Sequence, residues 1–385
     1  MKILHLFANW KWTGPAEPAL STAALQSEHH QVLFASGKAK DDQPSKILPH
    51  AIERGVETVE GFHLSKHARV AANREDVRRL IDLLRDFEPD IVHTHLENDH
   101  RIASLAMRGV EGAKLVRTVY DVEGLSAGFR TRRVARRRLD GLIVTTAHGQ
   151  AHTLAAYGGA EKRVSVGGRP RPMKLIETGV DLKRFDAHRF DREASRTELG
   201  LHPEHVAVGI VARVQPHRRF ELLLDAVASL SRTHPSFRLV VAGRGTHIER
   251  LLLRPVQERG LSDIVVAPGY VKGEGYPRLL AALDACLFLV PGSDGTCRAL
   301  REQMAMGLAP IVTPRPPLPE IIEEGSAGLV VDESSDGILQ GLKRLIEQPA
   351  LRERLGEGAA AAAQARFNAR TLAEKTVQFY ETLLA

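Results

Sequence analysis

Apolar runs of strand length alternate with segments of helical period along the whole chain, and this alternation constrains the fold more than any other feature. Such alternation is typical of parallel sheets covered by helices. Strands are predicted at residues 3–6, 31–35, 91–93, 114–119, 141–145, 206–211, 237–242, 264–266, 285–289, 309–312 and 328–331. Helices are predicted between them, most clearly at residues 19–27, 75–87, 129–139, 221–233, 247–258, 275–282 and 370–384. We therefore expect an α/β protein.

The length of 385 residues exceeds what one ordinary hydrophobic core covers, so two domains are expected. The stretch 167–203 is rich in Gly, Pro, Arg and Asp, as an interdomain connection would be. We predict a first Rossmann-like domain over residues 1–175, a linker over 176–203 and a second Rossmann-like domain over 204–365. The last helix, within 366–385, is predicted to pack back on the first domain.

Composition excludes some classes of function. Hydrophobic residues make up 43% and charged residues 26%, which fits a soluble enzyme, whereas 5% aromatic residues are too few for a stacking-based nucleic-acid binder. No apolar stretch approaches the roughly 18 residues that span a bilayer, and the first residues are too short for a signal-peptide core. The two cysteines, Cys286 and Cys297, suggest neither a disulfide framework nor a metal site. A cytoplasmic location is expected.

A net charge of +6 favours anionic partners. The charge is most concentrated between Arg130 and Arg138, where six arginines stand in a predicted helix beside Phe129, Val134 and Leu139. The helix is either a solvated surface or a footprint on anionic lipid, which would place the protein peripherally at the inner face of the membrane. A nucleic-acid partner is not expected, because no zinc, helix-turn-helix or RNA-recognition signature accompanies these arginines.

The segment 286–307 carries the densest chemistry. Its apolar run ends at Pro291-Gly292, after which Ser293 and Asp294 stand where an N-cap would open a helix that runs to about residue 306. The backbone amides of Gly295, Thr296 and Cys297 would then be free to bind sugar hydroxyls or phosphate oxygens. Asp294 and Glu302 would lie about two helical turns apart, roughly 12 Å, and could address one extended ligand.

This segment resembles the E-x7-E motif of family 4, or group 1, retaining glycosyltransferases, with Asp294 for the first Glu and Arg298 in the position that follows the motif's F-G. Residues 307–312, 318–331 and 176–185 resemble further motifs of that family. The resemblance implies a GT-B fold, in which two Rossmann-like domains face each other across a cleft. It also implies transfer of a sugar, with retention, from a nucleotide-diphosphate donor to a glycan or lipid-linked acceptor hydroxyl in cell-envelope polysaccharide or glycolipid synthesis.

The second strong signal is Arg213 and Arg218, which lie between a strand and a helix and could hold a diphosphate by bidentate hydrogen bonds. Their spacing resembles the V-G-R-L-x-x-x-K-G motif of the family, with Arg219 in the place of the second glycine, which predicts a more cationic loop. Fixed cations would stabilise the leaving diphosphate without a metal ion. The resemblance also places Val271 and Lys272 in the loop that receives the nucleobase.

In the first domain, Gly14 stands in the family's G-G-x-E loop, but Pro15 replaces the second glycine and has no amide hydrogen to offer a phosphate. The remaining candidates are assigned to the acceptor: Trp10, Trp12, His95, Asn98 and Tyr120. Tyr120 replaces the family's His, and a phenol can donate a hydrogen bond but is a poor base at neutral pH.

A metal interpretation of His93, His95 and His100 is weaker than a core or acceptor role, because no acid stands at ligand spacing. No metal or other cofactor is therefore expected. Three alternatives stay open. Tyr120, Pro15 and Arg219 would also suit a degenerate protein that binds sugar nucleotides without turnover; a GT-B epimerase would share the fold; and the arginine-rich helix alone would suit a polyanion binder.

Overall fold

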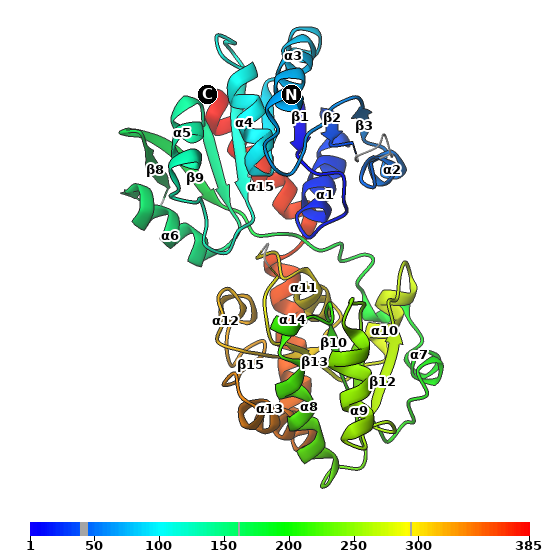
Figure 1. The fold of residues 1–385 in the computed structure, drawn as a ribbon. Helices are drawn as coiled ribbons and strands as arrows, with labels where there is room; N and C mark the ends of the chain where they lie inside the picture. The colour runs from blue at the N-terminus through cyan, green and yellow to red at the C-terminus, as the bar shows by residue number, and fades with distance from the viewer. Residues whose placement is uncertain (39–44, 161, 293–294) are drawn as a thin grey trace. The chain divides into compact units, whose positions relative to one another are not determined.

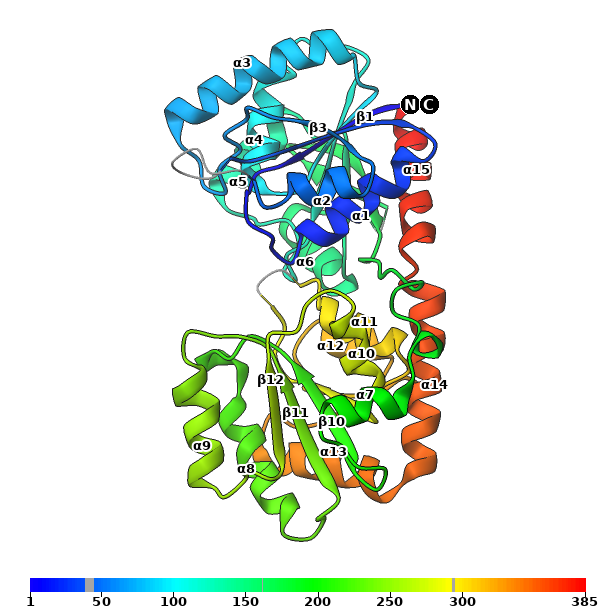
Figure 2. The same ribbon diagram turned by 90° about the vertical axis from the view of Figure 1, so that its right-hand side faces the viewer.

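The computed structural model describes residues 1–38, 45–160, 162–292 and 295–385. Its contacts divide the chain into two compact units. The first contains Met1–Gly179, the short stretch that ends at Thr296 and the C-terminal stretch Ala369–Ala385, and the second contains Val180–Gly292 and Cys297–Asn368. The chain therefore returns to the first unit at its end. Figures 1 and 2 show the elements of both units.

A largely parallel sheet forms the centre of the first unit, in the strand order β3-β2-β1-β4-β5-β6-β9-β8-β7. Its strands are β1 (Lys2–Phe7), β2 (Gln31–Ser36), β3 (Glu57–Val59), β4 (Ile91–Thr94), β5 (Lys114–Val119), β6 (Gly141–Val144), β7 (Gly159–Ala160), β8 (Arg163–Val166) and β9 (Arg169–Leu175). The pairs β7-β8 and β8-β9 are antiparallel, and the other pairs are parallel. The central strands are apolar and buried because helices cover a parallel sheet on both faces.

The helices of the first unit are α1 (Ala16–Ser27), α2 (Leu48–Glu53), α3 (Val70–Phe87), α4 (Glu97–Ala106), α5 (Phe129–Arg137), α6 (Ala147–Tyr157) and α15 (Ala369–Leu384). The last of them, α15, packs beside α1, as Figure 2 shows. Its apolar side chains Leu372, Phe379 and Leu383 join the core of the first unit. Arg370 of α15 pairs with Glu28 at 2.6 Å. The C-terminal helix is therefore part of the first unit.

A parallel sheet also forms the centre of the second unit, in the order β12-β11-β10-β13-β14-β15. Its strands are β10 (Val206–Val211), β11 (Phe237–Ala242), β12 (Val265–Gly269), β13 (Ala285–Phe288), β14 (Ala309–Val312) and β15 (Leu329–Val330). Its helices are α7 (Arg192–Glu198), α8 (Phe220–Ser231), α9 (Arg254–Glu258), α10 (Gly275–Ala281), α11 (Arg298–Ala305), α12 (Leu318–Ile322), α13 (Ser335–Glu347) and α14 (Pro349–Arg366). Short 3-10 helices span Ala187–Arg189 and Pro216–Arg218, and a π-helical segment, Glu249–Leu253, leads into α9.

The predicted α/β class is confirmed, and the predicted strands 114–119 and 206–211 coincide with β5 and β10. The prediction of an irregular connection from residue 167 is wrong at its start, because Arg169–Leu175 forms β9. Pro170 and Pro172 hid this strand. Both prolines lie opposite β8, whereas the pairing with β6 begins only at Met173. Prolines are tolerated in a strand where no ladder hydrogen bond needs their missing amide.

The helix predicted to open at Ser293 and Asp294 begins later, at Arg298. Gly295 has φ +62° and Cys297 has φ +41°, which are left-handed conformations that an α-helix cannot contain. The expected spacing of two helical turns between residues 294 and 302 is therefore wrong. Asp294 itself lies outside the described residues. Among the helices that the structure describes, none combines the length and the apolar character needed to cross a bilayer.

Candidate functional site

The second sheet changes direction at β10 and β13. From β10 the chain proceeds outward to β11 and β12, and it then returns to the other side of β10 to lay down β13, β14 and β15. In open α/β sheets ligands bind outside the carboxyl ends of the strands at such a switch point. Arg213 and Arg218 follow β10, and residues 297–302 of the second unit follow β13. The topology therefore brings these two groups of predicted residues to the same edge of the sheet.

The two arginines that follow β10 differ in their surroundings. Arg213 is exposed directly after the strand, whereas Arg218 is half-buried at the end of a 3-10 turn. The Nη1 atom of Arg218 donates a hydrogen bond to the carbonyl oxygen of Val290, which lies just beyond β13. This bond connects the two loops across the switch point. Arg218 is therefore held in place, and Arg213 presents its charge to solvent.

Arg219 adopts φ +62°, a left-handed conformation that glycine favours and that suits the glycine of the family motif. Its Nε lies 2.7 Å from Glu333, which also binds Arg315. These hydrogen bonds, from Arg315 first and then from Arg219, lower the pKa of Glu333 to about 2. Arg219 therefore pairs with an acid that Arg315 also binds, and the effect of Arg219 on the charge of the loop stays a prediction.

Glu302 lies on α11 and its side chain is largely buried. The hydroxyl of Tyr276, on α10, donates a hydrogen bond of 3.0 Å to Oε2 of Glu302, and Arg298 lies 3.4 Å from Oε1. Burial, and then the charge of Glu302, raise the pKa of Tyr276 well above its ordinary value. Tyr276 therefore remains a neutral donor, and the two contacts fix the carboxylate in one orientation.

The other residues assigned to the donor lie in two loops. Cys297, Val271 and Lys272 belong to the second unit, whereas Gly295 and Thr296 are grouped with the first. Gly295, Thr296 and Cys297 are buried in the loop that leads into α11. Val271 and Lys272 follow β12, where Val271 is half-buried and Lys272 is exposed, its ammonium 5.5 Å from the centre of the Tyr270 ring. The roles of all five residues stay predictions.

The first sheet has its own switch point between β1 and β4. Trp10, Trp12 and Gly14 follow β1, and His95 and Asn98 follow β4, so the topology brings these predicted residues to one edge as well. Asp99 organises this edge. Its carboxylate accepts hydrogen bonds from the backbone amides of residue 8, at 2.9 Å, of residue 96, at 2.9 and 3.0 Å, and of residue 100, at 2.7 Å.

Asp99 is fully buried, and burial raises its pKa to about 7 while these backbone amides oppose the rise. Asn98 is also buried, and its amide pairs with Asn73 and donates to the carbonyl of Ser65. These contacts occupy the Asn98 side chain within the fold. Trp10 and Trp12 are half-buried. The Trp10 ring has Lys11 and Lys46 over its face, and the Trp12 ring packs on His50.

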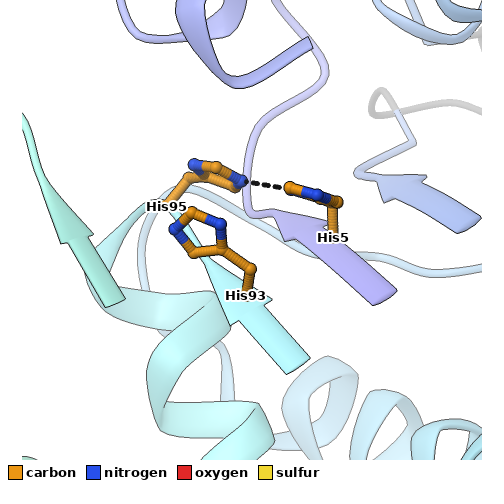
Figure 3. A group of neighbouring side chains, drawn as sticks. All are labelled: His5, His93 and His95. Atoms are coloured by element: carbon orange, nitrogen blue, oxygen red, sulfur yellow. Dashed lines mark hydrogen bonds between the residues drawn. The ribbon is translucent and has the colours of Figure 1, made fainter. Parts of the chain in front are cut away.

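Three histidines meet beneath this edge. Two of them, His93 and His95, were considered in the sequence, and the third is His5 in place of His100. His5, His93 and His95 cluster, as Figure 3 shows, with one nitrogen of each within 4.8 Å of the others. His100 lies apart, and its Nε2 bonds to the carbonyl of Arg138. Burial lowers the pKa of His5 to about 4 and lowers the pKa values of His93 and His95 well below 6.5. All three imidazoles are therefore neutral at pH 7.

Sequence reasoning missed several residues of these two edges. His5 had a usable signal, since it is the polar residue inside an otherwise apolar strand and buried polar groups need partners. Asp99 had another, since it stands in the first turn of a helix directly after a strand. Gln26, Tyr380 and Tyr276 gave no local signal, because their partners lie 21 to 287 residues away in the chain.

The sequence matches two family descriptions, "Glycosyltransferase Family 4" over residues 20–184 and "Glycosyl transferases group 1" over residues 191–362. The chain belongs to the group 1 glycosyltransferases. A D-inositol 3-phosphate glycosyltransferase of Saccharomonospora viridis is 27% identical over 320 residues, which cover 77% of this chain and 70% of that protein. Spore coat protein SA of Bacillus subtilis is 28% identical over 226 residues, which cover 54% of this chain and 58% of that protein. The chain thus spans less than two thirds of the length of spore coat protein SA.

Among solved structures, HepE of Anabaena in complex with UDP superimposes with a TM-score of 0.80 at 18% identity, covering 99% of this glycosyltransferase and 100% of HepE. Further HepE structures contain UDP and glucose, or UDP-glucose. At this level of identity the likeness concerns the fold. The chain therefore has the GT-B fold, and the expected fold class with two parallel-sheet domains is confirmed.

Proposed function

We propose that this glycosyltransferase transfers a sugar from a nucleotide-diphosphate donor to an acceptor hydroxyl, with retention of configuration. The observation that supports it most is the switch point of the second sheet, where Arg213, Arg218 and Glu302 follow β10 and β13. Cations and an oriented carboxylate at the carboxyl ends of adjacent parallel strands suit a ligand that carries both phosphates and hydroxyls.

In this proposal Arg213 and Arg218 hold the diphosphate, where negative charge grows as the glycosyl-phosphate bond breaks. Fixed cations stabilise that charge without reorganising during the reaction. Glu302, held by Tyr276 and Arg298, accepts hydrogen bonds from the ribose hydroxyls. Asp294 binds the sugar hydroxyls and Gly14 borders the reacting carbon. The arginines take the electrostatic role that a metal ion would otherwise have, so the reaction is proposed to need none.

We propose UDP as the nucleotide, since HepE, which has the same fold, binds UDP. The acceptor is proposed to be a glycan or a lipid-linked glycan of the cell envelope, bound by the first unit at the edge that holds Trp10, Trp12 and Tyr120. This pathway is supported by the family to which the chain belongs and by the basic helix α5.

The basic helix is proposed to rest on anionic lipid. Arg130, Arg133 and Arg137 are exposed on α5 beside Phe129, whose side chain is 77% exposed. Burial, followed by the positive charges of neighbouring arginines, lowers the pKa of Arg137. Clustered cations beside an exposed aromatic ring are typical of membrane-surface segments. Two other arginines of the run serve the fold, because Arg132 and Arg138 donate to internal carbonyl groups.

The donor assignment is tested by calorimetric titration with UDP, GDP, ADP and TDP and their common sugars. UDP is expected to bind the wild type, and Arg213→Ala is expected to weaken its binding about tenfold or more, as loss of a charge-assisted contact does. Arg232→Ala, at the far end of α8, is the matched control. Binding of UDP that is unchanged in Arg213→Ala would remove this arginine from the site, and no nucleotide binding at all would favour a non-catalytic protein.

The lipid assignment is tested by co-sedimentation with vesicles of phosphatidylcholine, with and without phosphatidylglycerol. The wild type is expected to sediment only with the anionic vesicles, and Arg133→Glu with Arg137→Glu is expected to abolish this. The matched control is Arg85→Glu on α3, where the arginine is exposed and faces Asp82. Equal sedimentation of the double variant and the control would show that α5 is an ordinary solvated surface.

A further inference from the structure

Four side chains of the first unit form a continuous chain of hydrogen bonds. The Tyr120 hydroxyl lies 2.9 Å from Nδ1 of His95, Nε2 of His95 lies 2.9 Å from Nδ1 of His5, and Nε2 of His5 lies 2.8 Å from Oε1 of Gln26. All four residues are at most 6% exposed. They come from β1, α1, the loop after β4 and the residue after β5. The sheet therefore assembles the chain from four separate segments.

The ring geometry identifies these contacts as hydrogen bonds and not as a converging set of metal ligands. The His5 and His95 rings are inclined by only 13°, with centroids 5.2 Å apart and nitrogens 2.9 Å apart. The rings therefore lie end to end, and the two nitrogens point straight at each other, along the dashed line in Figure 3. Ligands of a tetrahedral metal would instead point at a common third position about 2.0 Å from each nitrogen.

The hydrogen bonds of this network all donate in one direction, and Gln26 sets that direction. Because the imidazoles are neutral, each carries one ring N–H. Oε1 of Gln26 can only accept, so Nε2 of His5 donates to it and Nδ1 of His5 is left to accept. His95 therefore donates from Nε2 and accepts at Nδ1, and the hydrogen on that second bond must come from the Tyr120 hydroxyl. The hydrogen of Tyr120 is thus committed to the protein interior.

A second set of contacts on the other side of Gln26 is consistent with this direction. The Tyr380 hydroxyl lies 2.5 Å from Nδ1 of His93, and Nε2 of His93 lies 2.7 Å from Oγ1 of Thr118. The amide nitrogen of Gln26 meets no partner at good hydrogen-bond geometry, yet Gln26 is close enough to Tyr380 to lower its pKa against the larger rise caused by burial. Tyr380 next to the amide nitrogen leaves the amide oxygen for His5.

Both ends of this network, Tyr120 and Thr118, line one small cavity of about 30 Å³ in the first unit. The cavity lies at the carboxyl ends of β4, β5 and β6, where ligands of parallel sheets bind. A site of this size holds about two water molecules or one hydroxyl group of a larger ligand. Its lining is mixed, with the polar residues His95, Thr145 and Thr178 beside apolar ones such as Ile143, Ile176 and Leu372.

We infer that Tyr120 is a specificity-determining residue that accepts a hydrogen bond from a substrate hydroxyl in this cavity, and that His95, His5 and Gln26 are positioning residues that prevent it from donating. The inference rests on the proposed function, since it takes the hydroxyl to belong to a sugar or an acceptor. The chain of hydrogen bonds ends at the amide oxygen of Gln26, which cannot take up a proton. It therefore orients Tyr120 and does not carry protons away.

The direction of the chain is tested without any ligand, by ¹⁵N NMR of histidine-labelled protein, because protonated and bare ring nitrogens resonate far apart. His5 and His95 are expected to carry hydrogen on Nε2 in the wild type and in Gln26→Glu, whose carboxylate also only accepts. Gln26→Met, which has similar length and cannot accept this bond, is expected to release His5 into a mixture of tautomers. Hydrogen on Nδ1 of His95 in the wild type would overturn the inference, because Tyr120 would then be free to donate outward.

The role of Tyr120 is tested by steady-state kinetics with UDP-glucose and with any other nucleotide sugar that binds. Tyr120→Phe keeps the ring and removes the oxygen, and is expected to raise the KM of one substrate about three- to tenfold with a smaller change in kcat. Gln26→Met is expected to shift the same KM and Gln26→Glu to leave it unchanged. KM values unaffected by Tyr120→Phe would overturn the inference. If the wild type turns over no nucleotide sugar, the proposed function fails, and the NMR result alone decides the direction of the chain.

Discussion

At the scale of single residues, neighbouring arginines in one loop have different roles because they have different partners. Arg218 binds the carbonyl oxygen of Val290 and so connects the loops after β10 and β13. Arg219 turns the other way and pairs with Glu333 and Glu221. Their common residue type did not reveal this difference in the sequence. It became visible only in the structure, where Arg219 has a left-handed backbone with φ +62° and the two side chains have different partners.

Glu333 predicts a pH dependence of stability. Its folded pKa of about 2 lies below the value of 4.5 for a free side chain, so its contribution is complete above pH 4.5 and is lost as the pH falls toward 2. Glu333→Gln is expected to lower the free energy of unfolding by about 1 kcal/mol at pH 7, after allowance for solvent screening, and by nothing near pH 2. Urea denaturation at several pH values measures this.

The control for that series is Glu357→Gln, at an exposed position of α14. This variant is expected to follow the wild type at every pH. An equal loss of stability in Glu333→Gln at pH 2 and pH 7 would contradict the account, because the ion pairs with Arg315 and Arg219 would then not be its source.

The hydrogen bond from Tyr276 to Glu302 leads to a prediction on donor binding. Tyr276→Phe removes the 3.0 Å hydrogen bond and keeps the ring that packs against Phe185. Because bonds to charged groups contribute about 1.5–3 kcal/mol, UDP binding is expected to weaken about tenfold, while the melting temperature changes little. Calorimetry with UDP measures this. Unchanged affinity in Tyr276→Phe alongside weakened affinity in Glu302→Gln would mean that Glu302 needs no partner to hold its place.

The residue scale also shows why the candidate site could be predicted only in part. Arg213 and Glu302 were found because short motifs mark them, and the strand order places both at one edge. The hydrogen-bond chain from Tyr120 to Gln26 could not be found as a whole, because its members are joined only through the packing of α1 on the sheet and of β1, β4 and β5 within it. A three-dimensional hydrogen-bond network leaves no trace in sequence spacing.

At the scale of elements, α14 shows a helix whose glycines are set by its neighbours. A Cβ atom added to Gly358 would lie 2.0 Å from the carbonyl oxygen of Ser326, and one added to Gly356 would lie 2.4 Å from that of Gly307. Backbone atoms cannot move aside as side chains do. The close approach of α14 to these two loops therefore requires glycine, although glycine weakens a helix interior.

This close approach predicts a reversal of the usual effect of Gly→Ala in a helix. Gly358→Ala is expected to destabilise the protein by about 2 kcal/mol, because overpacking outweighs the gain of roughly 1 kcal/mol in helix propensity. In the same helix Ala361 is exposed, and Ala361→Gly is expected to lose about 1 kcal/mol by propensity alone. Chemical denaturation measures both. A Gly358→Ala variant more stable than the wild type would show that α14 does not press on the Ser326 loop.

Regular elements were the most predictable part of the fold. Buried strands such as β5 and β10 are continuous apolar runs, and these are visible in sequence because parallel strands are buried on both faces. Elements at the margins were harder. β9 carries two prolines, and the start of α11 depends on the left-handed residues Gly295 and Cys297. The periodicity of apolar residues indicates which positions are buried. It gives no information on strand prolines or on left-handed backbone angles.

At the scale of the whole molecule, the chain builds two units, each around a mainly parallel sheet. It leaves the first unit after Gly179 and re-enters it at Ala369, where the backbone of Val180 pairs with that of Asn368. Each sheet has its own switch point, and the predicted residues lie at the carboxyl ends of the strands in both. We therefore propose that the second unit binds the nucleotide diphosphate and that the first binds the acceptor.

The central claim is retaining transfer from a nucleotide-diphosphate sugar, and the most direct measurement is proton NMR of the sugar that the purified protein releases from UDP-α-glucose and other donors. The account predicts that the first product formed keeps the α configuration, and that Arg213→Ala slows its release at least tenfold while Arg232→Ala does not. A first product of β configuration would contradict retention. A donor that is bound and never cleaved would contradict catalysis itself.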